Sequence, residues 1–170
     1  LLRFAMVYGA NASGKSNLLD AISFLQNFLF FKADDLYELT GAIPFKLDAA
    51  TPNEPTEFSL KFYVGKTKYW YELKLSSHNV ISEKLYYYDS PKPKKLFDRK
   101  LKNGQSIITF NPATVKISAA AKEEVSLKCL PNMSFFAARN QVNIAIEKVD
   151  VAKEWLRKNL MPLINPTTGM

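Results

Sequence analysis

The spacing of hydrophobic positions changes twice along the chain, and each change marks a different kind of element. Phe4 to Tyr8 form an unbroken apolar run, which is typical of a strand buried on both faces of a parallel sheet. Ser16 to Phe31 are apolar at helical spacing nearly all round, which predicts a helix buried between a sheet and a further layer. Between residues 56 and 110 apolar and polar positions alternate, which predicts antiparallel strands.

Turn residues divide the alternating region into strands. Gly65-Lys66 predicts one turn, and Asn103-Gly104 is a strong signal for a tight hairpin. The predicted strands cover residues 58–64, 69–75, 80–88, 96–99 and 106–110. We therefore expect an antiparallel meander.

The last third of the chain returns to helical patterns. Ser118 to Leu130 predict a helix that ends at Pro131, and Met133 to Ala137 predict a short apolar strand. Asp150 is a candidate cap for a final helix with an apolar stripe, which Pro162 closes.

A complete phosphate-binding loop, GANASGKS, links the first apolar run to the first helix. Gly9 and Gly14 allow positive φ and let backbone N–H groups turn toward phosphates. Lys15 is predicted to reach the β- and γ-phosphates, and the Ser16 hydroxyl to bind Mg²⁺. The predicted nucleotide-binding residues are Gly9, Ala10, Asn11, Ala12, Ser13, Gly14, Lys15, Ser16 and Asn17. The following helix adds its positive end to this anion site.

Two asparagines within the loop region narrow the class. Asn11 and Asn17 extend the motif to GxNxSGKSNLLDAI, which resembles the ABC-type ATPase heads of the SMC, RecF and OLD group. Further segments, IPFKLD, PTEFSLKF, KYWYELKL, ISEKLYYY and KKLFDR, follow in the order seen in AAA-family ATPases of bacterial abortive-infection and phage-defence systems. The likeness spans almost the whole chain, and the loop is its specific motif.

This resemblance implies an α/β P-loop NTPase lobe, similar to an ABC ATPase, with an antiparallel β meander. Residues 1–32 would hold the loop strand and helix, 56–110 the β-lobe, and 113–170 a helical region with one strand. We expect residues 1–170 to be an incomplete head, the first lobe of a larger ATPase. The resemblance also implies ATP and Mg²⁺ as cofactors and a second head as partner through ATP, with DNA and a fused or separate nuclease as further candidates.

Catalytic residues are only partly present. A Walker B strand is an apolar run that ends in two acidic residues, and the sequence contains none. The nearest acidic pairs, Asp34-Asp35 and Glu123-Glu124, do not follow apolar runs. We therefore expect negligible ATP turnover from this chain alone. In ABC-type heads a glutamine after the β-lobe contacts Mg²⁺ and the attacking water, and Gln141 stands at the corresponding place. The resemblance thus makes Gln141 a catalytic and metal-binding candidate beside Lys15, and an ordinary polar loop residue is the alternative.

Composition limits the location of the protein. The sequence contains no apolar run long enough to cross a membrane and no signal peptide pattern. The single cysteine, Cys129, cannot form an internal disulfide, which favours a reducing cytoplasm. We expect Cys129 to be a buried small apolar residue.

The net charge of +7 is concentrated around one predicted hairpin. Its basic residues are Lys92, Lys94, Lys95, Arg99, Lys100 and Lys102, and Tyr86 to Tyr88 precede them. Such a hairpin could bind a nucleic acid backbone, and the favoured alternative is a solvated hairpin whose lysines protect a sheet edge.

Three functions compete at this point. The first is the ATP-binding lobe of an SMC- or OLD-like ATPase. The second is another P-loop enzyme, a kinase or GTPase, which the asparagine pair and the absence of an NKxD motif disfavour. The third is a non-catalytic module in which the β-lobe binds a protein or nucleic acid. The complete phosphate loop favours the first.

Overall fold

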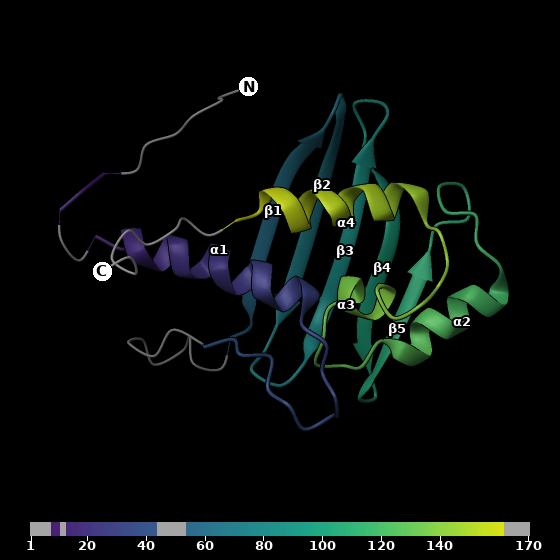
Figure 1. Ribbon diagram of the computed structural model, residues 1–170, viewed down its shortest axis with the longest axis horizontal. Helices are drawn as coiled ribbons and strands as arrows, with labels where there is room; N and C mark the ends of the chain where they lie inside the picture. Colours follow the sequence, from purple (N-terminus) through teal and green to yellow (C-terminus); the bar gives the residue numbers. More distant parts are fainter. Residues whose placement is uncertain (1–7, 11–12, 44–53, 162–170) are drawn as a thin grey trace.

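One five-stranded antiparallel sheet, with strands in chain order, forms the body of the computed structural model, which describes residues 8–10, 13–43 and 54–161 (Figure 1). The strands are β1 (Thr56–Val64), β2 (Thr67–Leu75), β3 (Val80–Tyr88), β4 (Lys94–Lys102) and β5 (Gln105–Phe110). The helices are α1 (Lys15–Phe30), α2 (Ala119–Lys128), α3 (Phe135–Arg139) and α4 (Glu147–Asn159). The predicted antiparallel meander is confirmed. Asn103 and Gly104 have φ of 50° and 76°, as a tight hairpin turn requires.

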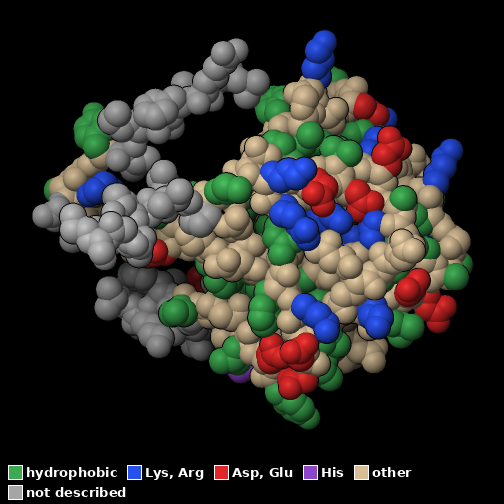
Figure 2. All heavy atoms as spheres, in the orientation of Figure 1, with side chains coloured by type: hydrophobic (Ala, Val, Ile, Leu, Met, Phe, Trp, Pro, Cys, Tyr) green, Lys and Arg blue, Asp and Glu red, His purple; other side chains and the backbone are tan. Residues whose placement is uncertain are grey.

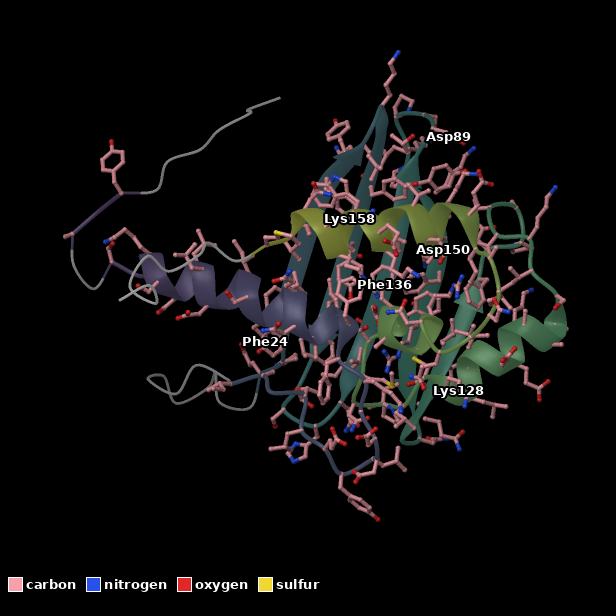
Figure 3. All side chains as sticks on the ribbon, in the orientation of Figure 1. Phe24, Asp89, Lys128, Phe136, Asp150 and Lys158 are labelled. Carbon is pink, nitrogen blue, oxygen red and sulfur yellow. The ribbon has the colours of Figure 1, made fainter. Side chains whose placement is uncertain are left out.

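The inner face of the sheet packs against the helices through aromatic side chains. Phe62 of β1 stacks on Trp155 of α4 with ring centroids 4.4 Å apart. The ring centroids of Phe97 on β4 and Phe135 on α3 lie 4.1 Å apart. Figure 3 shows Phe136, also on α3, over the middle of the sheet. The alternating pattern thus buries one face of each strand.

The segment predicted as a strand at Met133 to Ala137 is instead mostly the short helix α3, so that prediction is wrong. Ser134 caps the helix, because its hydroxyl accepts the Ala137 N–H at 3.0 Å. The same hydroxyl donates to the Leu29 carbonyl near the end of α1 at 2.6 Å. An apolar run of five residues fits either a buried strand or a buried helix turn, and the cap decides for the helix.

Only the second half of α1 is buried, which corrects the expectation of a helix covered along its length. Leu25, Phe28 and Leu29 are its buried residues, while Leu18 is 49% exposed. Figure 1 shows the N-terminal half of α1 projecting past β1. The described part of the chain supplies packing partners only for the C-terminal half of α1.

A buried ion pair joins the sheet to the segment before α3. Arg99 and Glu83 are both fully buried, and Nη1 of Arg99 lies 3.0 Å from Oε2 of Glu83. Arg99 also donates to the carbonyls of Leu130 and Met133, 31 and 34 residues farther along. Burial raises the pKa of the Glu83 carboxyl, and the Arg99 guanidinium opposes that rise. Arg99 is therefore a structural residue.

The final helix begins earlier than predicted. Asp150 lies in the first turn of α4, and its carboxylate accepts the Ile146 N–H at 2.8 Å. Arg139 at the end of α3 donates to the same carboxylate at 2.8 Å. Asp150 thus ties α3 to the start of α4 rather than preceding the helix as its cap. Within the described residues, no helix has the length and apolar character needed to cross a membrane.

Candidate nucleotide-binding site

The phosphate-binding loop lies at the free N-terminal end of α1. Lys15 is the first residue of the helix, and its Nζ donates to the carbonyls of Gly9 and Ala10 at 2.8 and 2.7 Å. A third bond, 3.2 Å long, joins Lys15 Nζ to the Ser13 hydroxyl. These contacts hold the lysine over its own loop, because all three acceptors lie within six residues of it.

The two glycines serve different purposes. Gly14 has φ of 83° and ψ of 8°, a left-handed conformation that favours glycine, so the predicted positive φ is confirmed there. Gly9 has no positive φ, which corrects the expectation for that residue. A Cβ at Gly9 would lie 2.9 Å from the Ser13 hydroxyl oxygen, so a larger residue there would require the Ser13 side chain to move.

The N-terminus of α1 is suited to an anion. No side chain caps the helix, and its first turn contains no acidic residue. Ser16 and Asn17 lie in that exposed first turn, next to Lys15. Uncapped N–H groups and the positive end of the helix dipole attract phosphate. The described loop residues therefore fit a triphosphate.

Some predicted residues are not tested by this geometry. Asn11, Ala12 and Phe4 to Val7 lie outside the described residues, and Tyr8, the last residue of the predicted strand, lies outside any strand. The predicted Mg²⁺ ligand Ser16 is exposed. Among residues 8–10, 13–43 and 54–161, no group of three or more His, Cys, Asp or Glu side chains gathers to hold a metal.

Gln141 follows α3 and is not brought next to the loop. Its side-chain nitrogen lies 3.4 Å from the Ala137 carbonyl. The cap of α3 contacts Leu29, which is about 21 Å along α1 from Lys15 at 1.5 Å per residue. Figure 1 shows α3 and the loop toward opposite ends of α1. A magnesium role for Gln141 stays a prediction.

Two other predictions concerned reactive or charged side chains. Cys129 is 3% exposed, and burial raises its pKa to about 11, so it is a buried thiol as expected. Arg99 was predicted to belong to a basic hairpin. It is fully buried, so it is not part of the basic surface. The signal that could have separated Arg99 from Lys100 is the alternation of strand faces.

Comparison with protein families identifies the domain. The family model described as "AAA domain, putative AbiEii toxin, Type IV TA system" matches residues 4–115, which include the loop, α1 and the whole sheet. The chain belongs to this AAA family. It is an ATP-binding P-loop domain, and its α/β structure fits the P-loop NTPase fold. Comparisons with curated proteins and with solved structures found no match.

Proposed function

We propose that this AAA domain is the ATP-binding lobe of an SMC- or OLD-like ATPase head. Mg²⁺-ATP would join two such heads, and the pair would act in a DNA-linked process such as phage defence or DNA maintenance. The observation that carries the proposal is the phosphate-binding loop at the uncapped N-terminus of α1. The asparagines of GxNxSGKSN support the SMC and OLD group over kinases and GTPases.

Lys15 has a simple role in this function. Its present partners are two carbonyls and a hydroxyl, all neutral oxygens of its own loop. A bond from the ammonium to a phosphate oxygen adds the attraction between opposite charges, which a neutral loop oxygen does not supply. The lysine can therefore exchange loop oxygens for phosphate oxygens, and Ser16 would offer its hydroxyl to Mg²⁺. A bound Mg²⁺ would neutralise charge on the phosphates.

The surface beside the loop supports a neighbouring protein partner. Leu18 and Leu19 follow the loop directly and are 49% and 38% exposed. Contiguous exposed apolar patches mark surfaces that another protein covers, and these two leucines would contribute to such a patch. A second head placed on the nucleotide would lie close to these leucines.

Calorimetric titration with ATPγS and GTPγS, with and without Mg²⁺, tests the proposal. We expect Mg²⁺-dependent binding that favours ATP. Lys15→Ala should weaken it by about 30- to 150-fold, because a hydrogen bond to a charged group contributes about 2–3 kcal/mol. Lys116→Ala is the control, because Lys116 is an exposed lysine outside the loop.

Each outcome has a distinct meaning. If Lys15→Ala binds ATPγS as tightly as the chain with Lys15, the assignment of the loop as the nucleotide-binding site is contradicted. Preference for GTP would favour the competing P-loop enzymes. Light scattering on the same samples tests pairing, and an unchanged mass with bound ATPγS would contradict the two-head arrangement while leaving ATP binding intact.

A further inference from the structure

The face of the sheet opposite the helices, here called the outer face, is strongly basic. Strand register places seven lysines on it: Lys61, Lys68, Lys74, Lys84, Lys95, Lys100 and Lys102. Its acidic residues are Glu57, Glu72 and Asp98. Seven lysines against three acids leave a surplus of four positive charges, more than half of the net +7 of the chain.

The helix-covered side differs from the outer face. Figure 2 shows basic and acidic side chains interspersed over α4. That helix contains four basic residues, Lys148, Lys153, Arg157 and Lys158, and three acidic ones, Glu147, Asp150 and Glu154. The outer face therefore carries a larger positive surplus than α4, and the partner expected on the outer face is an anion.

A transverse row of four side chains crosses the outer face. Lys61, Trp70, Tyr86 and Lys95 are neighbours in register on β1 to β4. The rings of Trp70 and Tyr86 stack with centroids 4.9 Å apart. Lys61 Nζ lies 5.0 Å from the Trp70 ring, and Lys95 Nζ lies 5.8 Å from the Tyr86 ring.

This row bears on how its part of the outer face would bind nucleic acid. Stacking of unpaired bases needs free aromatic faces. Because Trp70 lies between Lys61 and Tyr86, and Tyr86 between Trp70 and Lys95, both rings have neighbours on both sides. The row therefore presents ammonium groups rather than ring faces, which favours contacts with phosphates over contacts with bases.

Several lysines of this face are available for such contacts. Lys74, Lys84 and Lys95 form ion pairs with acids of the same face. In the described part of the chain, Lys61, Lys100 and Lys102 are exposed and have no acidic partner within ion-pair distance. They lie on β1 and β4, so they span most of the sheet.

We infer that the outer face binds the phosphate backbone of double-stranded DNA without reading its sequence. Nine-residue strands extend about 30 Å, close to one helical turn of a duplex at about 34 Å. Lysines would bind by releasing counterions. The inference rests on the proposed function for the choice of DNA over RNA, and it is independent of the phosphate loop.

Fluorescence anisotropy with a labelled 30-bp DNA duplex tests the inference. The triple variant Lys61→Glu, Lys100→Glu and Lys102→Glu should weaken binding at least about tenfold and lower the salt slope of log K by about three. The matched control is the triple variant Lys116→Glu, Lys122→Glu and Lys158→Glu. It changes the net charge by the same amount, at positions outside the outer face. It should retain most of the affinity. Lys158 lies on α4, on the helix-covered side (Figure 3).

The other outcomes overturn the inference. Equal loss in both triple variants would mean that net charge alone drives binding. Tighter binding of a 30-nucleotide single strand, of an RNA duplex or of phosphatidylserine vesicles would assign the face to another partner. The outer-face triple variant should bind ATPγS as tightly as the chain without these changes, so failure of ATP binding and failure of DNA binding are distinguishable.

Discussion

Lys15 and Arg99 are two cations with opposite environments. Among the described residues, Lys15 hydrogen-bonds only oxygens within six residues of it, on the exposed side of a loop. Arg99 is fully buried and bonds Ser106, seven residues away, together with groups 16 to 34 residues away. Local bonds to neutral oxygens can be exchanged for a ligand, whereas long-range bonds inside the core hold the fold. For these two residues, the sequence distance between the cation and its hydrogen-bond partners separates a ligand-binding role from a structural one.

The largest effect on stability is expected from Arg99→Ala. Removing one partner of a buried ion pair leaves Glu83 uncompensated, which costs about 3–5 kcal/mol of unfolding free energy. Urea unfolding measures this loss. Lys100→Ala is a matched control, because this neighbour lies on the opposite face and is exposed, so its cost should stay within about 0.5 kcal/mol.

The same variants sharpen the comparison with the loop. Where Arg99→Ala is folded, it should bind ATPγS with unchanged affinity, while Lys15→Ala should lose affinity with unchanged stability. Similar stability losses in the Arg99 and Lys100 variants would contradict the structural role of Arg99. Restoration of stability by adding Glu83→Gln to Arg99→Ala would support it, because the unpaired charge is then removed.

A smaller effect is expected from Ser134→Ala, which connects the two regions. The Ser134 hydroxyl caps α3 and also donates to the Leu29 carbonyl of α1. Losing both bonds should cost about 1–2 kcal/mol in urea unfolding. Ser118→Ala is the control, since Ser118 caps only α2, with an exposed bond to Ala121 N. An equal cost at both serines would contradict a tie between α3 and α1.

The smallest expected effect is on the titration of Tyr86. Burial raises its pKa to about 12, with Glu72 and Asp98 adding to the rise. Because the folded pKa is raised, stability contributed by the neutral phenol is present below about 10 and is lost as pH rises through about 12. The difference in absorbance near 295 nm between the unchanged chain and Tyr86→Phe should show this midpoint. A midpoint near 10 would contradict the covered ring in the outer-face row.

Much of the fold could be predicted from the sequence because its signals are local. Alternation and the Asn103-Gly104 turn predicted the antiparallel meander, which the structure confirms. The loop motif predicted the ATP-binding class that the family match supports. The Met133 to Ala137 prediction was wrong because an apolar run of five residues carries no period. The Ser134 hydroxyl caps α3 locally, and it also bonds a carbonyl 105 residues away, which no local pattern shows.

The sequence by itself determined the phosphate loop, the strands and their order, since each depends on residues a few positions apart. Only the tertiary structure decided which charges remain at the surface. Arg99 and Lys100 are neighbours in the sequence, yet the pleat of β4 buries the first and exposes the second. The tertiary structure also decided that the second half of α1, but not the first, is buried. Whether a residue is buried depends on packing partners from distant parts of the chain, and a local sequence pattern carries no information about those partners.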